Sequence, residues 1–226
     1  MLTQVDHLVV LAASLEDGER WCERTLGLKP GPGGQHVLMG THNRLLRIDS
    51  AAYDRAYLEI IAIEPGAPTQ RSAHQRRWFD LDDPQLAVRI ERDGPTLAHW
   101  VARTDSLQAA CAAWQAQGID RGERLAASRM TPQGLLQWQI TVRDDGARLF
   151  DGCLPTLIEW GDRHPAPAMA DRHLRLERLL ITHPQVDLLQ RAGQAIGLHG
   201  VHFQVGPPRI EARIDTAQGP VLIAGA

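Results

Sequence analysis

Apolar and polar residues change their spacing along the first part of the chain in a way that separates strands from a helix. Residues 5–12 form a run rich in aliphatic and β-branched side chains, which predicts a buried strand. Ser14 follows as a helix N-cap, and apolar residues recur at helical spacing from there to Gly27, a residue that favours a helix end. Three extended stretches come next, at 35–39, 43–49 and 56–64. The pattern predicts a strand–helix–three-strand unit.

The same order of elements starts again near residue 96. His7 precedes Ser14 by seven residues, and His99 precedes Ser106 by the same interval. Further extended stretches are expected at 122–129, 135–143 and 154–160. A repeat of this kind favours two copies of one βαβββ module over unrelated segments.

We therefore divide the chain into two modules, a connector and a shorter third module. The first module covers 1–64 and the second covers 96–161, while the connector, 65–95, is expected to contain a helix over 69–79. Residues 174–226 have the pattern of a partial βαβ-type module, without a metal-ligating residue at the corresponding position, and this module is expected to be structural. The predicted fold class is α+β: paired βαβββ modules forming a cupped mixed β-sheet, with the partial third module at the C-terminus.

The composition is that of an ordinary globular protein, and it narrows the classes of partner. Of the 226 residues, 43% are hydrophobic and 23% are charged, so a disordered chain is not expected. The formal net charge is −3 and no basic run exceeds Arg76-Arg77, so we expect no nucleic-acid partner. The longest uninterrupted apolar run is Leu8–Ala13. A membrane-spanning helix needs roughly 20 such residues, so we expect no membrane association.

Cysteine and lysine usage exclude further classes of protein. Three widely spaced cysteines and the lack of a secretory signal pattern indicate reduced thiols and a cytoplasmic protein. Lys29 is the single lysine, and it lies in a loop of glycine and proline. A phosphate-binding P-loop and Schiff-base chemistry are therefore both excluded.

The repeat also predicts where chemistry would take place. Two such modules pair with their sheets curved into a cup, which is a favourable place for a small-molecule site. His7 and Glu59 fall on the first and last strands of one module, and His99 and Glu159 hold the same places in the other. Imidazole and carboxylate ligands suit a divalent metal ion such as Zn, Fe, Mn, Ni or Co. These four residues therefore form a candidate metal site with positions left open for substrate.

Each of these residues also has a simpler interpretation. His7 and His99 could be core imidazoles that form hydrogen bonds to the backbone. Glu59 and Glu159 could face solvent or an interface. A buried carboxylate instead needs a metal, an arginine or a raised pKa, and either glutamate could then act as a catalytic base.

Several segments of the sequence resemble the glyoxalase-like branch of the vicinal oxygen chelate superfamily, which includes glyoxalases, bleomycin resistance proteins and extradiol dioxygenases. The segments that carry the resemblance are DHLVVLAASLEDGERWCERTLGLKPGPGGQHVLMGTHNRLL, YLEIIAIEP, WVARTDSL, SRMTPQGLLQW and LPTLIEWGDRHPAP. The resemblance covers nearly the whole chain. It implies paired βαβββ modules and a divalent metal that chelates neighbouring oxygens of the substrate in isomerase, lyase, epimerase or dioxygenase reactions.

The resemblance also assigns positions in this sequence. His7 matches the first-strand histidine of the superfamily, and His99 stands where its second histidine would be. Glu59 and Glu159 match the acids on the last strands of the two modules. Further motifs of the branch match the loop Gly40-Thr41-His42-Asn43 and the pair Arg129 and Trp138.

Substrate contacts are expected from polar and aromatic side chains near the cup. Arg103 and Arg129 could clamp a substrate carboxylate, although surface salt bridges are an ordinary alternative for arginine. His42 and Asn43 could line the cup or form a turn, and Trp138 could be a substrate platform or part of the core.

The function that we predict from the sequence is a metal-dependent lyase or isomerase acting on a small molecule with vicinal oxygens. Two acids in the ligand set favour these reactions over an extradiol-type dioxygenase. The alternative from another class is a metal-free small-molecule binding protein of the resistance type. The resemblance further implies a homodimer.

Overall fold

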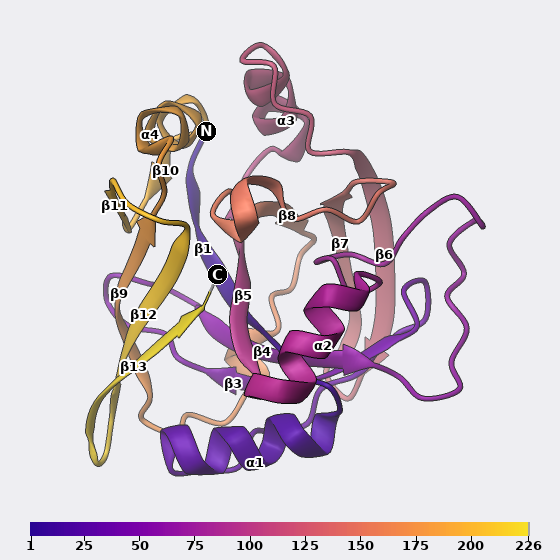
Figure 1. Ribbon diagram of the computed structural model, residues 1–226, viewed down its shortest axis with the longest axis vertical. Coiled ribbons are helices and arrows are strands. Elements are labelled where there is room, and N and C mark those ends of the chain that lie inside the picture. The colour runs from indigo at the N-terminus through magenta and orange to yellow at the C-terminus, as the bar shows by residue number, and fades with distance from the viewer. Residues whose placement is uncertain (226) are drawn as a thin grey trace.

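The computed structural model, which describes residues 1–225, has a large curved sheet at its centre (Figure 1). This nine-stranded sheet has the strand order β2-β3-β4-β1-β5-β8-β7-β6, with β10 added beside β1. The first module consists of β1 (Thr3–Leu11), α1 (Leu15–Leu26), β2 (Gln35–His36), β3 (Thr41–Arg47) and β4 (Tyr57–Ile63). Helix α1 begins where the sequence predicts, because the Ser14 side chain accepts a hydrogen bond from the Asp17 amide. It ends at Gly27, whose φ of 75° suits glycine.

The second module repeats this order and continues the same sheet. It consists of β5 (Thr96–Thr104), α3 (Leu107–Gln115), β6 (Glu123–Thr131), β7 (Gly134–Val142) and β8 (Thr156–Trp160). Strands β1 and β5 run antiparallel at the centre, where Val9 pairs with His99. The two modules therefore meet along their first strands, and the predicted α+β fold with paired βαβββ modules is confirmed.

The helix predicted over 69–79 is wrong. This segment is a series of turns, and the connector helix α2 (Pro84–Asp93) begins later, with Asp83 as its N-cap. Proline at the first helical position fits this start. The earlier segment is fixed instead by the buried Arg71 side chain, which donates hydrogen bonds to the carbonyls of Arg76 and Arg143. The contact between Arg71 and Arg143 joins distant parts of the chain, so the local spacing of apolar residues does not reveal it.

The last part of the chain forms a second, four-stranded sheet with the strand order β11-β9-β12-β13. This part of the chain consists of β9 (Arg175–Thr182), α4 (Val186–Ala195), β10 (Leu198–His199), β11 (Val201–Gln204), β12 (Arg209–Thr216) and β13 (Gly219–Gly225). Of these strands, β10 belongs to the large sheet. Figure 1 shows this sheet beside β1 and β5, on the side away from β6 and β7. Leu8 and Trp100 of the large sheet share one buried cluster with Leu179 and Ile210 of the second sheet. The second sheet therefore covers the convex back of the large one.

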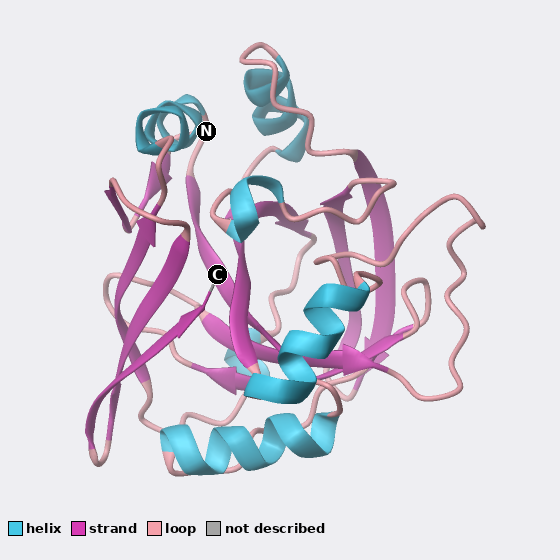
Figure 2. Ribbon diagram, viewed as in Figure 1, coloured by secondary structure: helices cyan, strands magenta, loops and turns pink. Residues whose placement is uncertain are grey.

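The two faces of the large sheet have different surroundings. On β1, Leu8 and Val10 belong to the core cluster on the back, while Val9 and Leu11 belong to a separate cluster on the concave side. In Figure 2 helix α2 crosses the middle of the view, whereas α1, α3 and α4 lie near its edges. His7 has the same strand parity as Val9, so its side chain lies on the concave side. No helix within residues 1–225 is long and apolar enough to cross a membrane.

The packing of the second sheet can be tested with two leucines. Leu179 on β9 is fully buried, whereas Leu222 on β13 of the same sheet is 59% exposed. We expect Leu179→Ala to lower the free energy of unfolding by about 2 to 5 kcal/mol, because it leaves a cavity between the two sheets. The matched Leu222→Ala change should cost less than about 0.5 kcal/mol. Urea denaturation measures both values, and equal effects would contradict the described packing.

Candidate functional site

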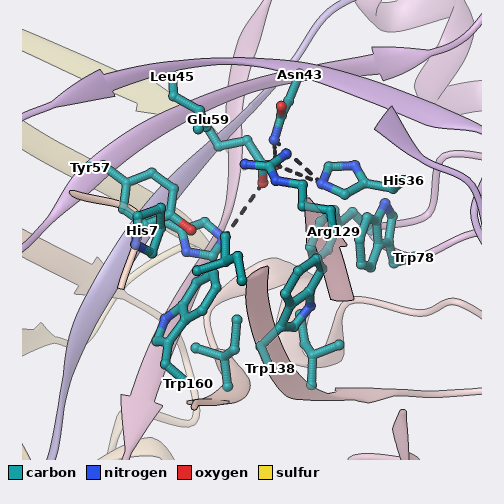
Figure 3. Close-up of a pocket in the computed structure, with 15 residues that line it drawn as sticks. His7, His36, Asn43, Leu45, Tyr57, Glu59, Trp78, Arg129, Trp138 and Trp160 are labelled. Atoms are coloured by element: carbon teal, nitrogen blue, oxygen red, sulfur yellow. Dashed lines mark hydrogen bonds and ion pairs between the residues drawn. The ribbon is translucent and has the colours of Figure 1, made fainter. Parts of the chain in front are cut away.

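A small cavity opens on the concave side of the large sheet, and we call it the inner cavity (Figure 3). Its free volume is about 40 Å³. That is room for about three water-sized groups. The lining residues come from both modules and the connector: His7, His36, Asn43, Leu45, Tyr57, Glu59, Trp78, Phe79, Arg129, Leu136, Trp138, Ile140, Ile158, Trp160 and Pro165. Polar groups lie mainly on strands of the first module, and apolar walls come mainly from the second.

An irregularity in β1 brings two neighbouring side chains together below this cavity. Val5 pairs with Ala102 and His7 pairs with Val101, so Asp6 is an extra residue in the ladder. A β-bulge of this kind breaks the alternation of side chains between the two faces. As a result, Asp6 Oδ1 lies 2.6 Å from Nδ1 of His7, the next residue in the chain.

The Asp6 carboxylate is fully buried and receives hydrogen bonds from three side chains. Its Oδ2 accepts from His164 Nε2 at 2.9 Å and from Trp160 Nε1 at 3.0 Å, in addition to the His7 contact at Oδ1. Burial by itself raises the pKa of Asp6, but the hydrogen bonds from His164 and His7 outweigh it and leave the pKa well below its ordinary value. Asp6 is therefore an ionised carboxylate held in one position.

Asp6 fixes the orientation of the His7 ring. An ionised carboxylate can only accept hydrogen bonds, so His7 Nδ1 carries a proton and Nε2 is the atom left to face the cavity. His7 Nε2 lies 3.5 Å from Glu59 Oε2, and the ring stacks on Tyr57 with 4.5 Å between centroids. The imidazole thus lies between two carboxylates, one on each side.

Glu59 is held by a hydrogen-bond chain that starts in the glycine-rich loop. The Gly34 amide donates to Asn43 Oδ1 at 2.7 Å, and Asn43 Nδ2 donates to Glu59 Oε1 at 2.6 Å. Gly33 makes this approach possible, because a Cβ atom there would overlap the backbone carbonyl of Asn43. Glu59 is only 5% exposed. Its Oε2 atom is left for His7 and for a ligand.

A second imidazole, which the sequence analysis missed, lies beside Glu59. His36 Nε2 is 3.8 Å from Glu59 Oε1, and His36 Nδ1 is 3.1 Å from Thr41 Oγ1. Burial lowers the pKa of His36 to about 4, although Glu59 acts in the opposite direction. His36 is therefore neutral at neutral pH. It lies on the two-residue strand β2, and the corresponding strand β6 of the second module has no histidine that could have drawn attention to it.

Arg129 supplies the positive charge of the inner cavity. The Arg129 side chain is half-buried, and among residues 1–225 it forms neither an ion pair nor a hydrogen bond. Gly34 leaves room for its guanidinium, since a Cβ atom at position 34 would overlap it. In Figure 3 the Arg129 guanidinium lies close to Asn43 and Glu59. The Arg129 guanidinium therefore has donors that no described residue uses, and its contact with a ligand carboxylate stays a prediction.

The structure does not bring His99 to His7 and Glu59. His99 is fully buried and contacts Phe79, which itself lines the inner cavity. Its Nδ1 donates to the Gly152 carbonyl at 3.1 Å, and its Nε2 accepts from Arg121 and from the Thr156 amide, each at 3.2 Å. Burial, with Arg121 adding to it, places the pKa of His99 well below its ordinary value. Both ring nitrogens are thus engaged by the protein.

Glu159 also lies outside the inner cavity. Its neighbours Ile158 and Trp160 line the cavity, so by strand alternation the Glu159 side chain points to the opposite face. There Glu159 Oε2 accepts a hydrogen bond of 2.6 Å from the amide of Leu107, the first residue of α3. The carboxylate therefore satisfies a free amide at the N-terminus of a helix.

Some of the predicted substrate-binding residues line the inner cavity and others lie outside it. Asn43, Arg129 and Trp138 line the inner cavity. Arg103 lies elsewhere, with hydrogen bonds to Gln4 and to the Asp54 carbonyl. His42 points away from the cavity, and its buried Nε2 has no hydrogen-bond partner in the part of the chain that the structure describes.

The donors in the cavity do not fit the four-ligand metal centre predicted from the sequence. His7 and His36 approach different oxygens of Glu59, at 3.5 and 3.8 Å, and the Asn43 amide lies against Glu59 Oε1 between them. No three His, Cys, Asp or Glu side chains of residues 1–225 converge closely enough to hold a metal ion. Protein ligands lie about 2 Å from such ions.

Comparison with known proteins gives a family and a fold. A family model described as a glyoxalase-like domain matches residues 5–197. A hypothetical protein from Staphylococcus aureus has a similar structure, with a TM-score of 0.62 and 12% identity over 92% of this chain and 86% of that chain. This likeness supports the fold alone. A search of curated proteins finds no match.

Two methylmalonyl-CoA epimerase structures are more distantly similar. The enzyme from Streptomyces coelicolor has a TM-score of 0.42 and 15% identity, over 72% of this chain and 97% of that chain. The enzyme from Mycobacterium tuberculosis has a TM-score of 0.38 and 15% identity, over 73% of this chain and 91% of that chain.

The charge on Asp6 can be tested through the pH dependence of stability. We expect Asp6→Asn to lower the free energy of unfolding at pH 7 by about 2 to 3 kcal/mol, because charge-assisted hydrogen bonds are lost. The folded-state pKa of Asp6 lies below its ordinary value of 3.8, so ionisation stabilises the fold above about pH 4. This contribution falls as the pH drops further, and the difference between variant and wild type should shrink. Denaturation at pH 7 and pH 3 measures it, with the exposed Asp162→Asn as control. A difference that is constant with pH would contradict an ionised Asp6.

Proposed function

The chain belongs to the glyoxalase-like domain family, and we propose that it is an isomerase or lyase that moves a proton at a carbon beside a carbonyl group. The observation that carries the proposal is the position of His7, with one carboxylate on each ring nitrogen. Glu59 would be the catalytic base and His7 the acid, both acting on one small molecule in the inner cavity.

Glu59 can act as the base through one specific atom. Oε1 is occupied by the Asn43 amide, whereas Oε2 faces His7 and the cavity. A proton removed from the substrate carbon would pass to Oε2. Glu59 is only 5% exposed, so this atom is shielded from bulk water.

His7 would supply the matching proton to the substrate oxygen. With Nδ1 bound to Asp6, a proton on Nε2 can pass to the carbonyl oxygen as negative charge develops there. The Asp6 carboxylate stabilises the charged imidazole before the transfer and keeps the ring in position afterwards. Asp6 is thus a positioning residue, which does not touch the substrate.

The remaining walls favour a small anionic substrate. Arg129 would bind a carboxylate or another anionic group next to the reacting carbon. Trp138 and Trp160, with 5.6 Å between their ring centroids, would cover the other side and limit the access of water. The reacting group must be small, given the size of the inner cavity.

A binding protein without catalysis is the second candidate function. The aromatic pair of Trp138 and Trp160 beside an uncompensated Arg129 also suits tight binding of an aromatic or apolar anion. An extradiol-type dioxygenase, the third function predicted from the sequence, would need a metal ion, and the metal content of the chain is tested below. The homodimer and the cytoplasmic location stay predictions.

The proposed proton transfer can be measured without knowing the natural substrate. We expect the wild-type protein to exchange a proton on the carbon beside the keto group of at least one 2-oxo acid or 2-hydroxy ketone for deuterium in D₂O, as followed by proton NMR. Glu59→Gln should slow the exchange by roughly 10² to 10⁴-fold, the usual contribution of a general base. Glu64→Gln is the matched control, because Glu64 follows the same strand but does not line the cavity. Tight binding of such compounds without exchange would favour the second candidate, and wild-type exchange by Glu59→Gln would refute the assignment.

The metal content of the chain tests the role of His7. We expect no stoichiometric Zn, Fe, Mn, Ni or Co after purification without a metal-binding tag, because the described donors do not converge. Inductively coupled plasma mass spectrometry measures this, with His7→Ala as the comparison. About one metal ion per chain, lost in His7→Ala, would return His7 to the ligand role predicted from the sequence and overturn its role as an acid.

A further inference from the structure

A second and larger cavity lies next to the inner one, and we call it the outer chamber. Its volume is about 410 Å³. That lies within the range of small-molecule sites. Its walls are the loop 31–33, strand β3, the tip of the β6–β7 hairpin and the segment 163–172. It shares four lining residues with the inner cavity, namely Leu45, Arg129, Leu136 and Pro165. The two cavities therefore meet at these residues.

The outer chamber has an apolar surface that a hydrocarbon segment could cover. Leu45, Leu46 and Leu136 come from the sheet, and Met169 comes from the segment after β8. Three prolines add to this lining: Pro32, Pro132 and Pro165. Covering such a surface removes apolar area from water, which favours a ligand with an apolar body.

The residues that line the outer chamber include arginines and no acidic side chain, so its charge is positive. Arg47, Arg129, Arg163 and Arg172 line it, and no acidic residue does. Arg47 is neutralised by Asp49, with hydrogen bonds of 2.8 and 2.7 Å. Each of the other three arginines has no carboxylate within 4 Å among residues 1–225.

Two of these arginines lie away from the inner cavity. Arg163 donates to the Gln133 carbonyl, a contact that leaves its charge uncompensated. Arg172 follows Asp171, but that carboxylate is bound by Arg175 at 2.8 and 2.9 Å. Arg163 and Arg172 therefore present positive charge in the outer chamber and outside the inner cavity, an arrangement complementary to an anion.

We propose that the outer chamber binds the distal part of the substrate, and that the substrate is an elongated amphipathic anion. Its reacting carbonyl end would enter the inner cavity beside Glu59, its apolar middle would cover Leu45 and Leu136, and a carboxylate or phosphate would lie between Arg163 and Arg172. This inference rests on the proposed function for the position of the reacting end. The inner cavity is too small to hold more than that end, so the rest of the molecule must lie outside it.

Four eight-carbon probes that differ only in their head group test the proposal: octanoate, octyl phosphate, octanol and octylammonium. Isothermal titration calorimetry should show that at least one anionic probe binds at least 10-fold more tightly than the alcohol and the amine. The Arg163→Ala/Arg172→Ala double variant should lose at least 10-fold in affinity for that probe. Arg124→Ala is the matched control, because Arg124 is exposed on β6 and lines neither cavity. The tighter of the two anions identifies the distal group as carboxylate or phosphate.

Two further variants separate this inference from the proposed function. Ala168→Trp places a large ring in the outer chamber and should abolish probe binding, whereas Glu64→Gln, outside both cavities, should leave probe binding unchanged. Equal binding of all four probes, or unchanged affinity in the double arginine variant, would overturn the inference even if deuterium exchange is observed. Probe binding without any exchange would instead support the chamber and count against the proposed function.

Discussion

Asp6 accepts hydrogen bonds from three side chains that come from two distant parts of the chain, and the geometry of the cavity depends on these contacts. His7 is its neighbour on β1, whereas Trp160 ends β8 of the second module and His164 follows it. One buried carboxylate thereby joins the first strand of one module to the last strand of the other. The same contact selects the His7 nitrogen that faces Glu59. A bulge in β1 makes it possible, because regular alternation would place Asp6 and His7 on opposite faces of the sheet.

This arrangement concentrates negative charge in a region with little water. Asp6 and Glu59 are both nearly inaccessible, and burying a carboxylate is costly unless it is paired or hydrogen-bonded. The chain meets this cost with fixed donors: the imidazole of His7 lies between the two acids, and the amide of Asn43 is itself held by the Gly34 backbone. A site built from fixed donors needs little rearrangement when a ligand binds, which is the condition for effective electrostatic stabilisation.

Local spacing predicted much of the fold, because helix caps and apolar periodicity are written in neighbouring residues. It also identified His7 and Glu59, which lie on the neighbouring parallel strands β1 and β4. Asp6 escaped notice because the bulge depends on the register with β5, which the sequence does not reveal. His36 lies on a strand too short to have a period. The helix expected over 69–79 failed for a related reason, since tertiary hydrogen bonds fix that segment.

The repeat in the sequence predicted a symmetric site, and the structure contains an asymmetric one. Strand pairing puts Thr156, not Glu159, at the place of Glu59 in the second module, because Glu59 pairs with Val9 and Thr156 with Val101. His99 and Glu159 are each engaged by structural groups of their own module. Moving Glu159 into the cup would leave the first amide of α3 without its acceptor and would reverse the alternation of β8. The second module instead contributes Arg129 and Trp138, which can bind and cover a ligand. Under the proposed function the first module would exchange the proton, so the duplicated fold would divide chemistry and binding between its halves.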